Sequence, residues 1–391
     1  MKKILFITNR NALTTCGALR LIKNRAEALF EDYGIASDFV VLQRNDRINS
    51  PKREPISAGG NMTIVGYDRR NYYGALNKLK SEIINILKKN TYDAIIISQI
   101  ALKINIVSIK EFTDAPIFLD IHGAPDDIYG SVNKASVLPY LYRRLIASYY
   151  IKCLKYYCKK VDGCLVVSHG LEEYIRNRFM LKDGFVFYRV PCALSTELNI
   201  SDYKDFRNAY RREFELDEKD ISFVYSGGLE PWQCINETVE LYKKIADSIK
   251  ASTKMMIFSY EIEKLRTMLG TDNRFVLRSY KSDELSKALC ACDYAFLIRE
   301  DITTNHVAFP NKFLEYVKSY LKIIATAHVH DVADQINLYK LGFITDLKNV
   351  DTLCSYIQAS KDLSISPETI KEVLKINSFK VRLKEFAEQI G

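Results

Sequence analysis

The stretch LIREDITTNHVAFPNKFLEYVKSYLKIIATA, residues 297–327, decides the fold. It begins at the end of an apolar run that starts at Tyr294, and Arg299 follows this run at once. A polar loop then leads to Pro310, whose fixed φ suits a first helical position, where a missing N–H costs nothing. Apolar residues with helical spacing follow, and residues 322–327 read as a second strand. The order strand, loop, helix, strand predicts one βαβ unit of a parallel sheet.

Three charged residues fall where such a unit binds its ligand. Open α/β sheets bind ligands at the carboxyl ends of their strands, and Arg299 lies at such an end. Lys312 and Glu315 belong to the first turns of the next helix, whose N–H groups favour an anion. Two cations and one carboxylate around a helix start suit a diphosphate joined to a ribose.

The same stretch resembles the donor-binding segment of family 4 of the retaining, nucleotide-sugar-dependent glycosyltransferases. That resemblance implies catalytic roles for Arg299 and Lys312, a ribose contact for Glu315, and a donor site that also includes Asn311. It also implies an α/β fold of the GT-B type, in which two Rossmann-like domains face each other across a cleft. The residues that match the family pattern are Arg299, Asn305, Val307, Ala308, Pro310, Lys312, Phe313, Glu315 and Tyr316.

The chain departs from the family pattern at two places in this segment. The broader family often has a second Glu where this chain has Val307, which affects the contacts to the donor sugar. The family usually ends the helix with Gly and begins the strand with Pro, and this chain has Tyr320 and Lys322 there. Because Gly adapts most easily to a helix C-terminus, the second departure predicts altered packing at the helix end.

Composition indicates a two-domain protein of the reducing cytoplasm. A length of 391 residues favours two domains or more, and an apolar fraction of 48% suffices for full cores. The nine cysteines include no CxxC pair, so neither a disulfide framework nor a zinc ribbon is predicted. The first residues, MKKILFITNR, are too short an apolar run for a signal peptide, and no run of 18 apolar residues would span a membrane.

The formal net charge of +8 allows nucleic acid, membrane surfaces or anionic substrates as partners. No zinc-finger spacing or RNA-binding consensus occurs, so nucleic acid is not expected as a partner. No metal site is expected either, because His328 and His330 form an HxH pair with no third ligand suggested nearby.

Strands and helices alternate in two series, which predicts two doubly wound halves. The first domain is expected at 1–198, the second and nucleotide-sugar-binding domain at 199–370, and a last helix at 371–391. The resemblance implies that this last helix crosses back to the first domain. A polar segment at about 196–220 is interpreted as the hinge, and residues 44–62 as a loop.

Two further segments match the donor side of the family. Gly17 lies in the first strand-to-helix loop, and Asp120, His122 and Gly123 follow a strand of the first half. The resemblance places the small-residue loop, Asp120 and the histidine at the donor. It implies a catalytic role for His122, whose neutral imidazole could accept a hydroxyl proton or hydrogen-bond the sugar. A turn glycine and a structural histidine are the alternatives.

A glycine pair follows the first strand of the second half. Gly227 and Gly228 would let the backbone approach a phosphate closely, although a simple tight turn is the alternative. The family commonly adds an Arg and a Lys after this loop, where this chain has Glu230 and Gln233. Phosphate charge is therefore expected to fall on Arg299 and Lys312.

Residues 138–160 form the clearest amphipathic stretch. At about 100° per residue, Arg144, Lys152, Lys155 and Lys159 fall within roughly 80° of one another, with Leu145 and Tyr149 among the apolar residues opposite. Either the helix packs on the core with a solvated basic face, or it docks on anionic lipid.

The sequence therefore predicts a metal-independent, cofactor-free retaining glycosyltransferase. The expected donor is a uridine-diphosphate sugar and the acceptor a lipid-linked glycan of bacterial surface-polysaccharide synthesis, with the enzyme at the inner face of the plasma membrane. A nucleotide-sugar epimerase or a phosphorylase of similar fold is one alternative. A catalytically silent partner subunit is another, suggested by Val307 and by the missing Arg and Lys after Gly228.

Overall fold

The computed structural model describes residues 1–9, 17–47, 53–68, 71–98, 103–126, 128, 137–191 and 200–390. The chain folds into two compact units. Unit 1 comprises Met1–Cys192 together with Phe379–Gly391, and unit 2 comprises Ala193–Ser378.

Unit 1 contains an eight-stranded sheet in the order β3-β4-β2-β1-β5-β6-β7-β8. All neighbouring strands are parallel except β3 and β4, so the sheet is a doubly wound one with an antiparallel edge strand. The strands are β1 (Lys3–Thr8), β2 (Ala36–Arg44), β3 (Arg53–Pro55), β4 (Asn61–Tyr67), β5 (Ala94–Ser98), β6 (Ile117–Ile121), β7 (Gly163–Val166) and β8 (Val186–Arg189).

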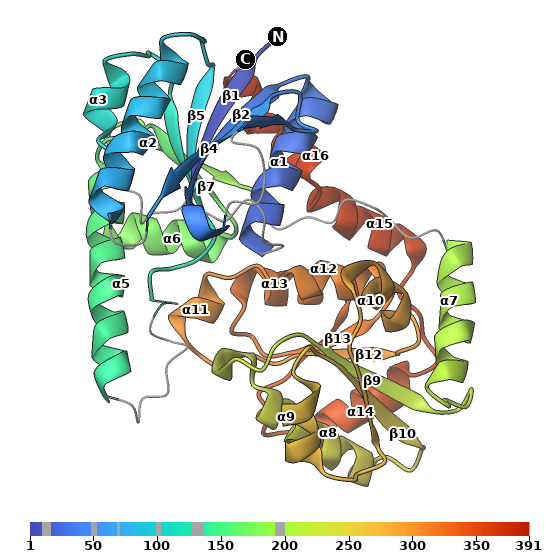
Figure 1. The fold of residues 1–391 in the computed structure, drawn as a ribbon. Helices are drawn as coiled ribbons and strands as arrows, with labels where there is room; N and C mark the ends of the chain where they lie inside the picture. Colours follow the sequence, from blue (N-terminus) through green and yellow to red (C-terminus); the bar gives the residue numbers. More distant parts are fainter. Residues whose placement is uncertain are drawn as a thin grey trace. The chain divides into compact units, whose positions relative to one another are not determined.

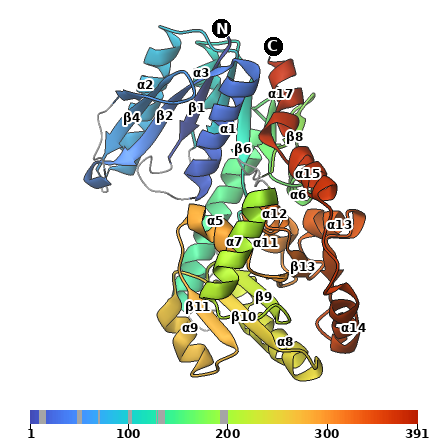
Figure 2. The same ribbon diagram turned by 90° about the vertical axis from the view of Figure 1, so that its right-hand side faces the viewer.

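Helices cover both faces of this sheet, and Figure 1 shows α1 and α2 on opposite sides of the strands. The two C-terminal helices belong to this unit, and α17 lies beside β8 (Figure 2). Phe386 of α17 packs edge-on against Phe118 and Tyr188, with ring centroids 5.2 Å apart in both pairs. The helices are α1 (Gly17–Tyr33), α2 (Tyr72–Leu87), α3 (Ile106–Lys110), α5 (Val137–Cys158), α6 (His169–Arg178), α16 (Phe379–Arg382) and α17 (Lys384–Gln389), with a 3-10 turn η1 (Asn45–Arg47).

Unit 2 contains a six-stranded, all-parallel sheet in the order β11-β10-β9-β12-β13-β14. Numbered within the unit, this is the order 3-2-1-4-5-6 of a Rossmann fold. The three rings of Phe223, Tyr294 and Phe296 stack across β9 and β12, with centroids 5.4 and 5.6 Å apart, and form the centre of its core. The strands are β9 (Ile221–Ser226), β10 (Thr253–Phe258), β11 (Phe275–Arg278), β12 (Tyr294–Leu297), β13 (Lys322–Ala325) and β14 (Gly342–Ile344).

The helices of unit 2 also lie on both faces of its sheet. In Figure 1, α8, α9 and α14 lie below the strands, and α10, α12 and α13 lie above them. The helices are α7 (Ile200–Glu213), α8 (Ile235–Ser248), α9 (Ile262–Leu269), α10 (Ser282–Leu289), α11 (Thr303–His306), α12 (Asn311–Lys318), α13 (His330–Leu338), α14 (Val350–Ser360) and α15 (Pro367–Ile376), with a 3-10 turn η2 (Pro231–Gln233).

The end of α12 shows how the chain manages without the family's glycine. Tyr320 adopts a left-handed φ of +60°. The N–H of Leu321 donates to the Tyr316 carbonyl and that of Tyr320 to the Val317 carbonyl, both at 3.0 Å, which closes a Schellman motif. The Tyr320 ring packs on Tyr203 of α7, with centroids 4.6 Å apart. This contact offsets a left-handed conformation that costs about 1 kcal/mol without glycine.

Three sequence-based expectations about secondary structure are wrong. Residues 200–213, assigned to the hinge, form α7, whose aromatic residues recur at helical spacing, while residues 192–199 lie outside the described part. Residues 44–62 contain β3 and the start of β4, because Met62, Ile64 and Val65 enter the core. The expected last helix is instead three helices, α15, α16 and α17.

The long helix α5 is buried only in its C-terminal half. Leu154 and Tyr157 lie in the core, whereas Tyr142 is 65% and Leu145 is 71% exposed. Leu145, expected on the apolar core-facing side, is therefore in solvent, because α5 extends beyond the strands that it covers. No helix among the described residues is both long and apolar enough to cross a membrane.

Candidate active site

The strand order of unit 2 fixes where a ligand can bind. Going outward from the middle of the sheet, β9 is followed by β10 on one side, and β12 is followed by β13 on the other. Between β9 and β12 the chain therefore reverses direction, and open α/β sheets bind ligands at the carboxyl ends of the strands at such a switch point. Gly227 follows β9 there, and Arg299 follows β12 and Ile298.

Arg299 is buried, with 6% of its surface exposed, and its backbone is fixed by β13. The N–H of Arg299 donates to Thr326 Oγ1, and that hydroxyl donates to the Arg299 carbonyl, both at 3.0 Å. Arg299 Nη1 donates to the Ile298 carbonyl at 3.0 Å. Burial lowers the pKa of Arg299, and the nearby hydroxyl of Tyr225 acts in the opposite direction. The guanidinium is thus a charge held in a low-dielectric position by main-chain contacts.

Lys312, in the first turn of α12, brings a second cation to the same place. Its Nζ donates to Gln233 Oε1 and lies 4.5 Å from the centroid of the Tyr225 ring. Burial, and after it the charge of Arg299, lowers the pKa of Lys312 well below its ordinary value of 10.5. The two cations are therefore close enough to repel each other electrostatically.

Gly227 allows the ammonium group to approach the backbone. Its φ is +139°, a conformation that favours glycine, and a Cβ at this position would collide with the Lys312 ammonium. The backbone conformation therefore favours glycine here, and the space that a Cβ would fill holds the end of the Lys312 side chain.

Neither Arg299 nor Lys312 forms an ion pair with a carboxylate within the part of the chain that the structure describes, although Glu230 and Glu315 act on the charge of Lys312 from farther away. A buried cation without a counter-charge is costly, so the arrangement is suited to an anion that arrives from outside. The first N–H groups of α12 add to it, because the N-cap residue Pro310 provides no side-chain cap. The sequence predicted Pro310 at the first helical position, and the structure places it one residue earlier.

The other residues expected at the donor are distributed around this helix start. Asn305 is buried, and its Nδ2 donates to the carbonyls of Glu300 at 2.8 Å and of Trp232 at 3.3 Å, so it braces the loop. Val307 is buried, Ala308, Pro310 and Glu315 are partly exposed, and Asn311 is exposed.

Aromatic hydroxyls, to which the sequence pattern assigned no role, hold the glycine loop. Tyr316, fully buried in α12, accepts a hydrogen bond at 3.0 Å from the N–H of Ser226, and burial raises its pKa to about 12. The hydroxyl of Tyr225 donates to the Gly228 carbonyl. The sequence does contain a signal for these two roles. Tyr316 is part of the family pattern, and Tyr225 ends the apolar run before the glycines.

A second polar cluster lies at the carboxyl end of β6 in unit 1. Asp120 Oδ1 pairs with Arg25 of α1, and Asp120 Oδ2 accepts from Ser98 Oγ at 2.6 Å and contacts His122 Nε2 at 2.9 Å. Burial alone would raise the pKa of Asp120, but Arg25, His122 and Ser98 together hold it well below its ordinary value. His122 Nδ1 is buried and has no partner among the described residues.

Arg25 is the residue of this cluster that the sequence did not predict. Its side chain is 1% exposed, and it also donates to the Val190 carbonyl. It lies 95 residues before Asp120. In an amphipathic helical pattern, a basic residue is normally predicted to face solvent. Gly17, expected in the same region, is the first residue of α1, and the loop before it lies outside the described residues.

One group of side chains among the described residues has the composition of a metal site: Asp301, His306 and His328. The first two belong to the loop and short helix after β12, and the third follows β13. His328 is the member of the HxH pair that belongs to this group, and its two partners come from the preceding segment after β12.

Comparisons with solved structures show the fold. Sucrose-phosphate synthase from Thermosynechococcus elongatus matches with a TM-score of 0.72 at 13% identity over 100% of this chain and 99% of that chain. The apo form of the lipopolysaccharide outer core galactosyltransferase WaaB matches with a TM-score of 0.66 at 15% identity, over 99% of both chains. Anabaena HepE in complex with UDP matches with a TM-score of 0.61 at 12% identity over 100% of this chain and 95% of that chain.

These likenesses confirm the predicted α/β fold with two Rossmann-like units of the GT-B type. No protein-family model and no curated protein sequence matches the chain.

Proposed function

We propose that the protein is a retaining glycosyltransferase that moves a sugar from a nucleoside diphosphate sugar to a glycan acceptor. The observation that carries the proposal is the pair of cations, Arg299 and Lys312, at the switch point of unit 2, neither of which forms an ion pair with a carboxylate of the described chain. A diphosphate is the anion that fits two adjacent cations and the uncapped start of α12.

In this reaction the acceptor hydroxyl attacks the sugar on the face from which the diphosphate leaves. The bond from the anomeric carbon to the diphosphate oxygen breaks, and the electron pair stays on the diphosphate. The new glycosidic bond forms to the acceptor oxygen, whose proton passes to the leaving diphosphate oxygen. Arg299, Lys312 and the first N–H groups of α12 stabilise the charge that grows there, which is electrostatic catalysis by a preorganised site. Glu315 holds the ribose hydroxyls. Since these groups already supply positive charge, the leaving group needs no metal ion.

His122 is assigned to the donor sugar. His122 Nε2 contacts the Asp120 carboxylate at 2.9 Å, and a neutral ring that donates through Nε2 has its lone pair on Nδ1. An unpartnered Nδ1 can accept a hydrogen bond from a sugar hydroxyl. Asp120 then acts as a positioning residue that fixes the tautomer of His122.

Uridine is the proposed base and a lipid-linked glycan the proposed acceptor. HepE, which has the same fold, was solved in complex with UDP, and WaaB is described as a lipopolysaccharide outer core galactosyltransferase. These neighbours support the two assignments as chemistry known on this fold.

The test is a screen of nucleoside diphosphate sugars for slow hydrolysis, preceded by calorimetry with the free nucleoside diphosphates. We expect UDP to bind and one UDP-sugar to be hydrolysed with retention at the anomeric carbon, as read by NMR. Tight nucleotide binding without hydrolysis or transfer would instead identify a silent partner subunit. Absence of nucleotide binding would overturn the proposal.

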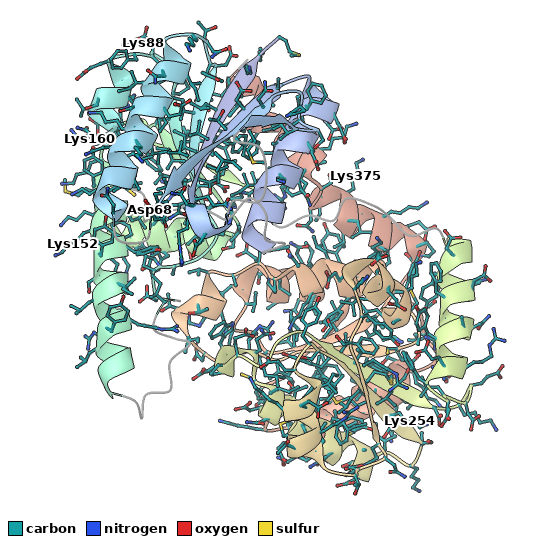
Figure 3. All side chains as sticks on the ribbon, viewed as in Figure 1. Asp68, Lys88, Lys152, Lys160, Lys254 and Lys375 are labelled. Carbon is teal, nitrogen blue, oxygen red and sulfur yellow. The ribbon has the colours of Figure 1, made fainter. Side chains whose placement is uncertain are left out.

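Peripheral membrane binding through α5 is part of the same proposal. The exposed N-terminal half of α5 presents Leu141, Tyr142 and Leu145 together with the exposed Arg143 and Arg144. Further along, Lys152 extends away from the sheet of unit 1 (Figure 3). Apolar side chains that insert among headgroups and basic ones that meet anionic lipid are the two components of an interfacial helix.

Vesicle sedimentation tests this docking surface. Binding to phosphatidylglycerol vesicles should weaken as salt is raised, because salt screens the basic side chains. Charge reversal at Arg144, Lys152, Lys155 and Lys159 should abolish binding, and Leu145→Ser should weaken it. Charge reversal at Lys254, a lysine of unit 2 whose Nζ contacts the Glu215 carbonyl at 2.8 Å, is the control. Unchanged binding after reversal on α5 would leave that face a solvated surface.

A further inference from the structure

Three of the five histidines of the chain gather in one place in unit 2. His306 ends α11, His328 lies between β13 and α13, and His330 is the first residue of α13. The rings of His306 and His330 stack with centroids 4.7 Å apart, and those of His306 and His328 lie 6.4 Å apart. Such a gathering of imidazoles around a carboxylate, Asp301, is what a transition-metal ion selects.

The distances within the group are close to those of a coordination sphere. His306 Nε2 lies 2.7 Å and His328 Nδ1 lies 3.7 Å from Asp301 Oδ1, and one ligand atom from each residue lies within 4.8 Å of the others. Zinc bonds of about 2.0–2.2 Å to nitrogen and oxygen place neighbouring ligand atoms of a tetrahedral site roughly 3.3 Å apart. Small side-chain rotations are therefore enough to surround an ion.

The backbone that carries these ligands is already fixed. Asn305 Nδ2 donates to the Glu300 carbonyl at 2.8 Å, which closes the loop on either side of Asp301. The two hydrogen bonds between Thr326 and the backbone of Arg299 join this loop to the end of β13, two residues before His328. Ligand-bearing loops that need not reorganise bind a metal ion at less entropic cost.

We propose that Asp301, His306 and His328 bind one divalent transition-metal ion of the Zn²⁺ class. Two imidazoles and one carboxylate suit Zn²⁺ better than Mg²⁺ or Ca²⁺, which prefer oxygen ligands. Three protein ligands leave a fourth position open to water. The side chains are partly or fully exposed, so an ion can reach them from solvent.

The bound ion would cross-link the loop after β12 to the loop after β13. Its role is structural, because the charge of a leaving diphosphate is met by Arg299 and Lys312. The site does not depend on the proposed transfer reaction, and its test needs no substrate.

The test is calorimetric titration of the chelator-treated full chain with Zn²⁺, together with absorption spectra after Co²⁺ substitution. We expect one ion per chain, a higher melting temperature with Zn²⁺, and a tetrahedral Co²⁺ spectrum without sulfur charge transfer. Asp301→Asn, His306→Ala and His328→Ala should each weaken Zn²⁺ binding by more than about tenfold. These substitutions are at partly or fully exposed side chains and should leave the circular dichroism spectrum unchanged.

Two further histidines provide matched controls. His169→Ala removes a half-exposed histidine of α6 beside Glu173, and it should leave binding unchanged. His330→Ala removes the ring that stacks on His306, and it should change affinity by less than about threefold. Equal Zn²⁺ affinity in wild type and the three ligand variants, equal loss in His330→Ala, or a cobalt–sulfur band from the buried cysteines would each overturn the assignment.

Discussion

Each unit carries a polar cluster at the carboxyl ends of its strands. The two clusters differ in whether their cations form an ion pair with a carboxylate of the protein. In unit 1, Arg25 is paired with Asp120, which it contacts in the core. In unit 2, Arg299 and Lys312 lie close enough to affect each other, and neither forms an ion pair in the described chain, although Glu230 and Glu315 act on Lys312 from farther away. The first cluster has its counter-charge within the protein, and the second one is suited to an anion from outside.

This difference shows how similar architecture can serve two purposes. A complete ion pair lowers the cost of burial, and the same carboxylate contacts Nε2 of the neighbouring His122. A cation without an ion-pair partner keeps its desolvation cost until a ligand brings the opposite charge. Relief of that cost then adds to the free energy of ligand binding. The predictions below test this contrast, beginning with the largest expected effect.

Removing the carboxylate of unit 1 should be severely destabilising. Asp120→Ala leaves Arg25 buried without a counter-charge, which costs about 3–5 kcal/mol of unfolding free energy. Asp46→Ala, which breaks an exposed pair with Arg44, should cost less than about 1 kcal/mol. Urea unfolding followed by circular dichroism measures both. A cost below about 1 kcal/mol for Asp120→Ala would mean that Arg25 finds another partner and that the contrast is wrong.

The pH dependence of this pair has a definite sign. The pKa of Asp120 is lowered in the folded protein, so its contribution is fully present above the unfolded pKa of about 3.9. The contribution is lost as the pH falls from there through the folded pKa. Asp120→Asn, which keeps the shape, should remove this part of the acid sensitivity.

Removing a cation of unit 2 should affect turnover rather than folding. Arg299 meets phosphate charge that grows as the sugar leaves, so Arg299→Ala should lower kcat by roughly a hundredfold, about 3 kcal/mol. Arg278 is a matched control, because its Nη1 also donates to the preceding carbonyl, at 2.9 Å, at the end of β11. Steady-state kinetics that find similar losses in Arg278→Ala would remove Arg299 from the reaction.

The lowered pKa of Lys312 predicts a pH-dependent nucleotide affinity. A diphosphate binds the protonated amine and raises its pKa, so affinity should be constant below the lowered pKa of the free protein. Above it, affinity should fall by up to tenfold per pH unit toward the ordinary value of 10.5, with proton uptake on binding. Lys312→Arg keeps its charge at these pH values and should abolish the dependence. Calorimetry in buffers of different ionisation enthalpy measures both quantities.

Substitution of Glu315 should affect donor binding rather than turnover, the reverse of what is expected for Arg299. The ribose hardly changes during the reaction, so Glu315→Gln should raise the donor KM roughly tenfold with little change in kcat. If Glu315 only stabilises the start of α12, the variant should lose about 0.3–1 kcal/mol of stability and keep its nucleotide affinity. Melting temperature and nucleotide affinity, measured on the same variant, decide between the two.

The βαβ unit around Arg299 was predictable because local signals agree there. The apolar run before Arg299 forms β12, the helical spacing after Pro310 forms α12, and β13 begins at Lys322 as expected. Both units also follow from the alternation of strands and helices. Where local signals are weak, as in α7 and β4, tertiary packing decided the outcome and the expectations were wrong.

The partners of the site residues could not be read from the sequence. Arg25 and Asp120 are 95 residues apart, and the side chain of Gln233 meets Lys312 from 79 residues away. His328 meets Asp301 only because β12 and β13 are neighbours in the sheet. Pairing of this kind depends on which strands lie side by side, which hydrophobic periodicity does not specify.

Tyr320 has a consequence for how this segment can change over evolutionary time. It keeps the left-handed helix end that glycine occupies in the family pattern, and it depends on the ring of Tyr203 to do so. Loss of the Tyr203 ring alone removes the contact that offsets the left-handed conformation of Tyr320. Loss of the Tyr320 ring alone leaves Tyr203 without its packing partner. We therefore expect the two positions to covary among relatives, with glycine at 320 accompanied by loss of the aromatic residue at 203. Divergence at this helix end can then proceed in paired steps while the backbone of α12 beside the proposed donor site stays the same.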